Sequence, residues 1–331
     1  MKPKRRGADS LILYVAARTA LAALALLPRR AGLAFGRLLG LLYYRCSSRL
    51  RSITNANLRR AFGDSLDDAG RARIARTAFA HLGMICVDAA YFPRLLQRPT
   101  VRIAVYEGEE HLKEAAADGR GVLVFSGHFG HWELVALLQH RLGYPMSMVV
   151  RPLDNPWLDS LLVRVRCLGG NTLLPKRHAA RGILRALRDG RAVAILIDQN
   201  VRGDAGVFVD FFGHSASTTP SLATFAFKSG APIVPVFSYP LPDGRLLIRY
   251  RPALRPVRRG TLQEDIVTVM QECTRLLENE VRERPDCWLW MHNRWRTRPR
   301  ADNAALPPSA PRSPAGSSTT STISRLRSAA S

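Results

Sequence analysis

The sequence has few cysteines and lacks the short motifs that mark several common enzyme classes. Its five cysteines form no CxxC pair and no regular spacing; they stand at positions 46, 86, 167, 273 and 287. This pattern argues against a disulfide framework and predicts separate, reduced thiols in a protein that faces the cytoplasm. No GxSxG motif is present either, so no serine nucleophile in an elbow turn is predicted.

Acidic residues are also scarce, because 26 Asp and Glu stand against 49 Lys and Arg, a formal charge of +23. Such an excess favours an anionic partner: nucleic acid, an anionic membrane surface or an acidic substrate. The basic residues are scattered along the chain, and there is no zinc finger, basic zipper or RNA-binding aromatic motif. We therefore expect no nucleic-acid partner.

The chain is long enough for one large hydrophobic core, with 331 residues of which 47% are hydrophobic. Nothing between residues 45 and 300 resembles a flexible linker, so residues 46–300 are predicted to form a single catalytic domain. Residues 301–331 contain mainly Ser, Ala, Pro and Thr and no aromatic residue. We expect this tail to be disordered.

The N-terminus carries a membrane signal. A basic flank, MKPKRR, precedes the apolar stretch Leu11–Leu27, and Ala31–Tyr44 is apolar again. The first stretch spans only about 26 Å as a helix against a hydrocarbon core of about 30 Å, and Arg18 near its centre costs roughly 2.5–3.5 kcal/mol. There is no signal-peptide cleavage site. For residues 1–45 we favour a helix pair that lies in or partly enters the cytoplasmic leaflet, and whether residues 11–27 span the bilayer stays open.

Helices and strands alternate through the rest of the chain. An amphipathic helical pattern covers Ser52–Tyr91, and further helices are predicted at Glu109–Ala117, from Asn155-Pro156 onward and at Leu222–Lys228. Short apolar runs predict strands at Val101–Val105, Val122–Phe125, Met146–Val150, Ala192–Ile197, Ile233–Phe237 and Leu246–Tyr250. The predicted fold class is α/β, with a mainly parallel or mixed central sheet flanked by helices.

His128 and Glu133 lie in the stretch VLVFSGHFGHWEL, where a buried strand ends and a helix resumes near His131. On one continuous helix the two side chains would point about 140° apart, so they meet only if the loop folds back. Gly127 and Gly130 make such a fold favourable. The carboxylate would then hold one imidazole nitrogen while the other takes a proton from a hydroxyl. Without a protein nucleophile, that hydroxyl belongs to the substrate.

Two alternatives remain for this loop. His131 competes with His128 for the role of base, and either histidine can be a packing or capping residue. The two histidines with Glu133 lack the HExxH spacing of helical zinc sites and have no further ligands nearby, so we predict no metal. Asp198 follows another predicted strand and should reach the same rim of the sheet as His128.

Five blocks in order carry a family resemblance: SGHFGHWEL, RPLDNPWLD, DQN at 198–200, TTPSLATFAFKSGAPIVPVF and WLWMHNRWRTRP. Over roughly Leu11–Pro299 the chain resembles the lipid A late acyltransferases of the lauroyl/myristoyl type, within the lysophospholipid acyltransferase superfamily. The resemblance implies transfer of a fatty acyl chain from acyl carrier protein to a hydroxyl of a lipid A precursor at the cytoplasmic face of the inner membrane. His128 would be the base, Glu133 its partner, and the carrier thioester the donor, with no other cofactor.

The resemblance also points to substrate-binding residues. Arg151 and Arg166 lie in the family's RP-x2-NP-x2-D-x6-R run and are expected to clamp a phosphate or the carrier's phosphopantetheine. Asp198 is expected at the substrate site too, where it orients a loop or binds an arginine, and Gln199 supplies neutral hydrogen bonds. These residues stand where the glycerolipid branch has Phe-Pro-Glu-Gly, which favours the lipid A branch.

Near the C-terminal end, Trp288, Trp290 and Trp295 alternate with basic residues. We expect these indoles in a membrane interface or an acyl pocket.

Three other functions remain open: acylation of another glycolipid such as mannosylated phosphatidylinositol, thioester hydrolysis, and lipid binding without catalysis. The sequence does not decide the acyl chain length, the acceptor hydroxyl, carrier protein against coenzyme A as donor, or the oligomeric state.

Overall fold

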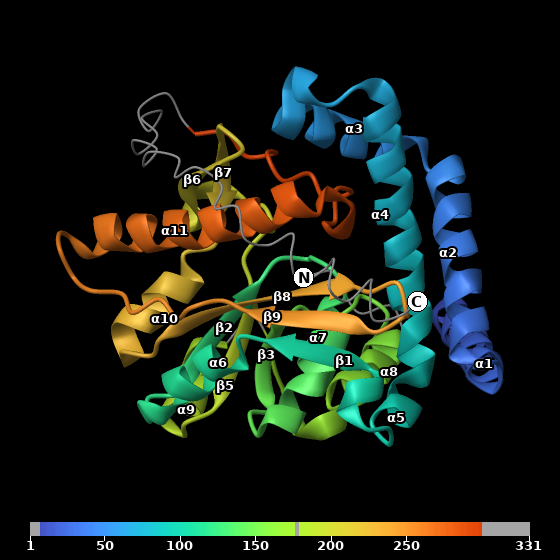
Figure 1. Cartoon of the computed structure of the whole chain (residues 1–331), viewed down its shortest axis with the longest axis horizontal. Coiled ribbons are helices and arrows are strands. Elements are labelled where there is room, and N and C mark those ends of the chain that lie inside the picture. Colours follow the sequence, from blue (N-terminus) through green and yellow to red (C-terminus); the bar gives the residue numbers. More distant parts are fainter. Residues whose placement is uncertain (1–6, 176–178, 300–331) are drawn as a thin grey trace.

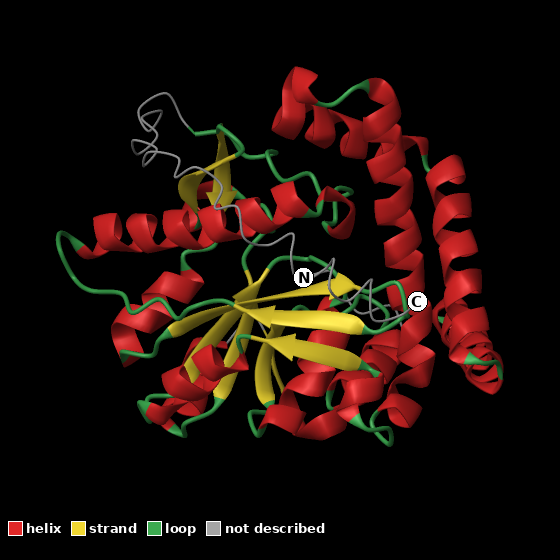
Figure 2. Cartoon of the chain, in the orientation of Figure 1, coloured by secondary structure: helices red, strands yellow, loops and turns green. Residues whose placement is uncertain are grey.

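The α/β organisation is built on a mixed seven-stranded sheet (Figures 1 and 2). The computed structural model describes residues 7–175 and 179–299. The strand order is β1-β9-β8-β2-β5-β3-β4, and every neighbouring pair is parallel except β8 and β9. The strands of the sheet are β1 (Ala104–Glu107), β2 (Val122–Ser126), β3 (Met146–Val150), β4 (Thr172–Pro175), β5 (Ala192–Leu196), β8 (Ile233–Pro240) and β9 (Leu246–Tyr250). This confirms the predicted fold class.

Helices cover both faces of this sheet. Along β2, Val122 and Val124 pack with the cluster around α6 (Glu109–Ala117) and α7 (Trp132–Leu138). Leu123 and Phe125 point to the other face, against α9 (Ala179–Arg188), α10 (Ser221–Ser229) and α11 (Leu262–Glu283). The strand is apolar throughout because both of its faces are buried. In Figure 1, α11 crosses one side of the sheet.

Adjacent strands β2 and β5 bring the two predicted strand-end residues together. The two strands pair parallel with Ser126 opposite Leu196, and the Ile197 N–H continues the ladder to the Ser126 carbonyl at 3.0 Å. His128 and Asp198 each follow two residues later, so both leave the sheet at its C-terminal rim, as predicted.

Several predicted elements match the structure, including strands β3 and β9 and helix α6. Asn155 caps α8 (Pro156–Arg166), as predicted, because its side chain accepts from the Trp157 and Leu158 N–H groups. The strand predicted at Val101–Val105 is wrong in its first half: Thr100–Arg102 forms a 3-10 turn closed by bonds to the Pro99 and Thr100 carbonyls. Helix α10 begins at Ser221, one residue before the predicted start at Leu222, and Pro220 is its N-cap residue.

Several elements were not predicted, including helix α9. The hairpin β6 (Val207–Phe211) and β7 (His214–Thr218) lies beyond the main sheet, and the polar residues of β7 conceal its strand character. Strand β4 is short and edge-located. Helix α11 begins with a capping box between Thr261 and Glu264.

The N-terminal part consists of α1 (Ala8–Leu26), α2 (Arg29–Cys46), α3 (Ser48–Phe62) and α4 (Asp68–Asp88), and a short α5 (Phe92–Leu95) follows. Helix α1 has no buried residue, and it is the one helix within residues 7–175 and 179–299 long and apolar enough to cross a membrane. Helices α2 and α4 run side by side (Figure 1). The predicted tail, residues 301–331, lies outside the described residues.

A stripe of glycines lets α2 approach α4 closely. Gly32, Gly36 and Gly40 are the buried residues of α2. A Cβ atom on Gly40 would lie 2.1 Å from the Phe79 carbonyl oxygen, so only glycine fits. The other side of α2 exposes large apolar side chains, with Leu38 61% exposed. Helix α2 is thus held firmly to α4 on one side and presents an apolar surface on the other.

Candidate active site

His128 and Asp198 form a hydrogen-bonded pair at the rim of the sheet. His128 Nδ1 lies 2.8 Å from Asp198 Oδ1, and the His128 backbone N–H donates to Oδ2 at 2.7 Å. The Trp288 indole N–H donates to the same Oδ2 at 2.9 Å. Asp198 is 4% exposed and His128 is half-buried. An ionised carboxylate accepts only, so Nδ1 carries the proton and Nε2 is left as the acceptor.

The pair shifts the pKa of both groups. Burial would raise the pKa of Asp198, but the nearby His128 charge and the hydrogen bonds from His128 and Trp288 outweigh it and lower the pKa to about 2. Burial would lower the pKa of His128, yet the Asp198 carboxylate raises it above its usual value, with a further contribution from Glu133. This is the base-and-orienter arrangement of hydroxyl-activating enzymes.

The loop that holds His128 is clamped to the segment around Trp288. Phe129 forms an isolated antiparallel bridge with Trp288, and the Leu289 N–H donates to the His128 carbonyl at 3.0 Å. Gly130 has a φ of 58°, and a Cβ there would lie 1.8 Å from the Ser238 carbonyl oxygen. The loop therefore requires glycine at this position, where its backbone is not helical.

Glu133 is placed differently from our expectation. Its carboxylate binds Arg166, with Arg166 Nε 2.9 Å from Oε2 and a second short contact from Nη2. Among the described residues no hydrogen bond joins Glu133 to His128. The expectation that Glu133 orients His128 is therefore wrong, because the loop does not fold back far enough. The imidazole nitrogen that Glu133 was expected to bind is bound by Asp198, which follows the neighbouring strand β5.

Asp198 likewise differs from the expected substrate contact. Three donors bind its carboxylate, and Asp198 lies behind His128, outside the cleft lining. The structure therefore places Asp198 as the partner of the histidine. The competing base, His131, is buried: its Nε2 lies 3.0 Å from Asp88, and its Nδ1 accepts the Leu134 N–H at 3.2 Å. With both nitrogens used, His131 has no acceptor left for a substrate proton, nor for a metal shared with His128.

The His128 side chain opens onto a cleft of about 1160 Å³. Part of the cleft is an apolar space between the sheet and α7, lined by Val124, Val135, Met146, Met148, Ala194 and Val236. Its mouth carries the exposed basic side chains of Arg49, Arg151, Arg202 and Arg296. The volume exceeds the usual range for a single small ligand, about 300–1,000 Å³.

The other predicted site residues line this cleft. The Gln199 amide nitrogen lies 3.4 Å from His128 Nε2. Arg166 is partly buried beside Glu133, whereas Arg151 is 81% exposed and lies 3.8 Å from Asp154. The structure therefore brings Arg166 and Gln199 next to His128 and leaves Arg151 at the mouth.

The three C-terminal tryptophans are in the core. Trp288 is 1%, Trp290 0% and Trp295 4% exposed, so the expected membrane-interface or acyl-pocket position is wrong. Trp288 packs edge-on against Trp290, Trp295 and Phe211, and Trp295 stacks on Phe211. Their contribution to the site is indirect, because Trp288 holds Asp198 and the His128 loop.

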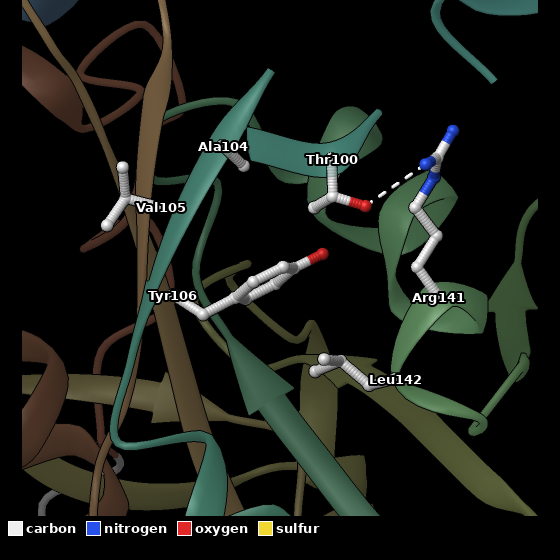
Figure 3. Close-up of a pocket in the computed structure, with 6 residues that line it drawn as sticks. All are labelled: Thr100, Ala104, Val105, Tyr106, Arg141 and Leu142. Carbon is white, nitrogen blue, oxygen red and sulfur yellow. Dashed lines mark hydrogen bonds between the residues drawn. The ribbon is translucent and has the colours of Figure 1, made fainter. Parts of the chain in front are cut away.

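A second hollow of about 410 Å³ lies at the start of β1 (Figure 3). Arg141 donates to Thr100 Oγ1 at 3.0 Å, and burial raises the pKa of Tyr106 to about 12. The Tyr106 hydroxyl is therefore not poised for proton transfer near neutral pH.

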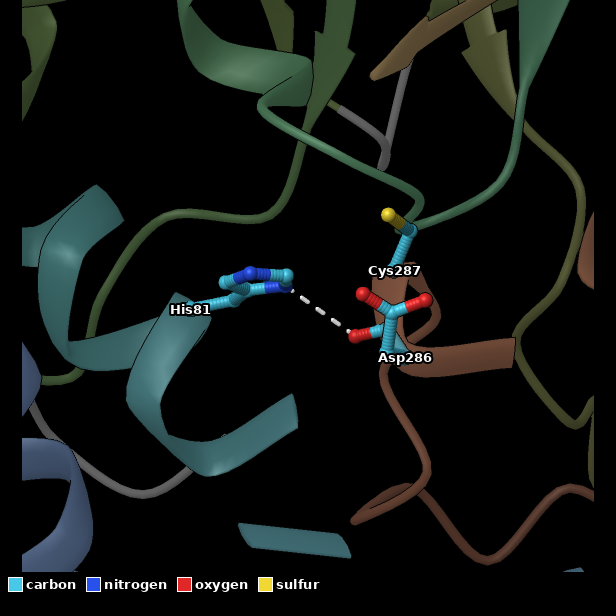
Figure 4. Close-up of side chains that lie close together, drawn as sticks. All are labelled: His81, Asp286 and Cys287. Atoms are coloured by element: carbon cyan, nitrogen blue, oxygen red, sulfur yellow. Dashed lines mark hydrogen bonds between the residues drawn. The ribbon is translucent and has the colours of Figure 1, made fainter. Parts of the chain in front are cut away.

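His81, Asp286 and Cys287 also lie close together, at the end of α11 (Figure 4). Arg284 binds the Asp286 carboxylate, with two distances of 3.1 Å. Burial raises the pKa of the Cys287 thiol to about 12, so the thiolate that a metal needs is disfavoured. These side chains fit a structural contact better than a metal site. All five cysteines are free thiols, as predicted.

Comparison with known proteins decides the family. The family model of bacterial lipid A biosynthesis acyltransferases matches residues 3–297. The chain belongs to this family. Within it, the chain is 28% identical to the lipid A biosynthesis lauroyltransferase of Escherichia coli K12 over 262 residues, 79% of this chain and 84% of that protein. It is 29% identical to the palmitoleoyltransferase of the same organism, over 76% of this chain and 80% of that protein.

Two more distant likenesses extend beyond lipid A. A phosphatidylinositol mannoside acyltransferase of Mycolicibacterium smegmatis is 24% identical to this chain. The match covers 56% of this chain and 60% of that protein. Among solved structures, 1-acyl-sn-glycerophosphate acyltransferase from Thermotoga maritima is 16% identical, with a TM-score of 0.35, over 75% of this chain and 98% of that chain. The resemblance inferred from the five sequence blocks is confirmed by the family match.

Proposed function

We propose that this acyltransferase moves a fatty acyl chain from an acyl carrier protein thioester to a hydroxyl of a lipid A precursor, by direct attack with His128 as the base. The observation that carries the proposal is the pairing of His128 Nδ1 with the buried Asp198, while Nε2 faces a cleft with an apolar arm and a basic mouth. Membership of the lipid A acyltransferase family supports the choice of reaction and acceptor.

The reaction needs no covalent enzyme intermediate. The acceptor hydroxyl gives its proton to His128 Nε2 as its oxygen attacks the thioester carbonyl carbon. The tetrahedral intermediate then collapses, the carbon–sulfur bond breaks, and His128 returns the proton to the departing thiolate. Asp198 stabilises the imidazolium between these two steps. Arg166 lines the cleft beside His128, and we assign it to stabilise the oxyanion, with Glu133 holding its guanidinium in place.

The cleft divides naturally between an acyl chain and a charged headgroup. The apolar arm between the sheet and α7 suits the acyl chain, which is bound by burial alone. Arg49, Arg202 and Arg296 at the mouth are exposed and have no hydrogen-bond or ion-pair partner within the described ranges. Lipid A precursors carry phosphates, and free guanidinium groups bind phosphate oxygens with strong charge-assisted bonds. Arg151 adds to the same positive mouth, and Gln199 would steady the acceptor next to His128.

The exposed apolar surfaces of α1 and α2 favour attachment to the inner membrane at its cytoplasmic face. Arg18 on α1 contacts the Tyr14 hydroxyl at 3.1 Å, so its charge is not left without a partner along an otherwise apolar helix. A membrane position would keep the cleft beside an acceptor that stays in the bilayer. The excess of positive charge also suits an acidic carrier protein as the donor.

His128→Ala in the full chain tests the proposal, with His214→Ala on the β6–β7 hairpin as a matched control. Acyl transfer from the carrier thioester to a lipid A precursor should fall roughly 100-fold or more in His128→Ala and stay within about 2-fold in the control. Full transfer by His128→Ala would refute the mechanism.

The same assay separates the alternatives. Free fatty acid formed at full rate without acceptor would identify a thioester hydrolase. Product only on a mannosylated phosphatidylinositol would identify another glycolipid as the acceptor, and lipid binding without turnover would indicate a non-catalytic protein.

A further inference from the structure

A buried ion pair connects the corner between α1 and α2 to the end of α4. Arg29, the first residue of α2, donates from Nε to Asp88 Oδ1 at 2.7 Å and from Nη2 to Oδ2 at 2.6 Å. Asp88, the last residue of α4, is 0% exposed. A carboxylate at a helix C-terminus opposes the helix dipole, and its burial costs several kcal/mol unless it is paired. Stability alone would not favour this side chain here.

Asp88 continues this contact to His131, next to the active-site loop. Its Oδ2 lies 3.0 Å from His131 Nε2. Burial would raise the pKa of Asp88, but the hydrogen bonds from Arg29 and His131 outweigh it and lower the pKa to about 2, so the group is a carboxylate that only accepts. Nε2 of His131 must therefore carry the proton, and Nδ1 is left as an acceptor.

That acceptor starts the helix of the active site. His131 Nδ1 accepts the N–H of Leu134, the third residue of α7, so an imidazole takes the place of the usual Ser or Asp cap. The first turn of α7 carries Glu133, which holds Arg166, and Trp132, whose ring centroid is 5.2 Å from that of His128. The backbone N–H of His131 is fixed by Ser238 Oγ at 2.8 Å.

We propose that Asp88 is a positioning residue which, bound to Arg29, keeps His131 in the capping tautomer and so couples the seating of the N-terminal helix pair to the reactivity of His128. Arg29 is the residue of α2 that binds Asp88, and it also donates to the Gly244 carbonyl in the β8–β9 turn at 3.2 Å. The expected effect on rate rests on the proposed acyl transfer, whereas the expected tautomer of His131 does not.

Arg29→Gln tests the coupling, and Arg30→Gln is its matched control. Arg30 is the next residue, is exposed, and has no hydrogen bond to any of these groups within the part of the chain described. Its substitution removes the same charge from the same corner of the molecule. In Arg29→Gln the buried carboxylate keeps only His131, whose imidazole should take a second proton and lose its capping acceptor. We expect kcat to fall about 10-fold or more with the donor KM within about 2-fold, since small misplacements at a reacting centre cost this much.

Two further measurements separate positioning from general damage. The side-chain nitrogen resonances of His131 in the full, detergent-solubilised chain should show the Nε2–H tautomer in the wild type and in Arg30→Gln, and an imidazolium in Arg29→Gln. The double variant Arg29→Gln/Asp88→Asn removes the stranded charge, while the amide oxygen of the introduced asparagine can still accept from His131 Nε2–H and keep the capping tautomer. It should therefore recover kcat to within about 3-fold of wild type.

Each alternative outcome refutes the coupling. Equal losses in Arg29→Gln and Arg30→Gln would show that only the corner charge matters, and a wild-type His131 spectrum in Arg29→Gln would show that Asp88 does not set the tautomer. A loss of kcat that tracks a loss of folded protein, without recovery in the double variant, would mean a purely structural pair. If the wild type shows no acyl transfer, the proposed function fails, while the resonances still test the tautomer.

Discussion

The pairing of His128 with Asp198 makes a sharp prediction, because two carboxylates compete for the role of orienter. Asp198→Asn keeps the size of the side chain but removes its charge and presents an amide to Nδ1. Glu133→Gln makes the same chemical change on the residue that binds Arg166. The structure predicts a large loss of kcat in the first variant and a small one in the second.

The magnitude follows from the interaction between the two groups. Burial opposes the ionisation of Asp198, yet its pKa falls from the ordinary 3.8 to about 2, so His128 and the other donors more than offset the cost of burying the charge. An asparagine that turns its amide N–H towards Nδ1 would also favour the wrong tautomer of His128. Losses of about 10⁴-fold are known for such a change in a histidine–aspartate pair. We therefore expect kcat to fall between about 10²- and 10⁴-fold in Asp198→Asn, and at most about 10-fold in Glu133→Gln.

The pH dependence of the rate gives a second test, because the direction of its shift is predicted. His128 must be neutral to act as base, so the rate rises with pH through its pKa, which lies above the ordinary value of 6.5 in the wild type. Asp198→Asn removes the carboxylate that favours the imidazolium, so the rise should move to lower pH. Steady-state kcat and kcat/KM for transfer from a carrier thioester, measured from pH 5 to 9, report both effects. If Glu133→Gln loses as much activity as Asp198→Asn, or if the rise does not move in Asp198→Asn, the assignment of Asp198 as orienter is refuted.

Two further predictions concern the helix pair and the mouth of the cleft. Gly40→Ala should lower the free energy of unfolding by about 1–2 kcal/mol in urea denaturation, because its Cβ would lie 2.1 Å from the Phe79 carbonyl oxygen; exposed Leu38→Ala should change it by less than about 0.5 kcal/mol. A Gly40→Ala protein as stable as the wild type would contradict close glycine packing. Arg296→Gln should raise the acceptor KM about 5-fold or more and leave donor KM unchanged, whereas Arg76→Gln, an exposed arginine outside the cleft, should alter neither. Equal acceptor KM values in the two variants would exclude Arg296 from headgroup binding.

Local patterns predicted much of the fold but left the contacts of the site open. Apolar runs located β2, β3, β5, β8 and β9, because strands buried on both faces are apolar throughout. The hairpin β6–β7 was missed because His214 and the serines of β7 carry no apolar alternation. For the tryptophans, composition alone misled: an indole near arginines is typical of a membrane interface, but Trp288 is buried and donates to Asp198.

By itself, the sequence determined the α/β class, the position of His128 at a strand end and the family, since these depend on periodicity and on ordered motifs. Tertiary structure alone decided which carboxylate holds His128, because Asp198 is 70 residues away in the chain and reaches it only when β5 pairs beside β2. It likewise decided that His131 is a cap held by Asp88 and not a base. Short-range patterns specify where an element begins and which face is apolar, whereas hydrogen-bond partners are chosen by the order of strands in the sheet.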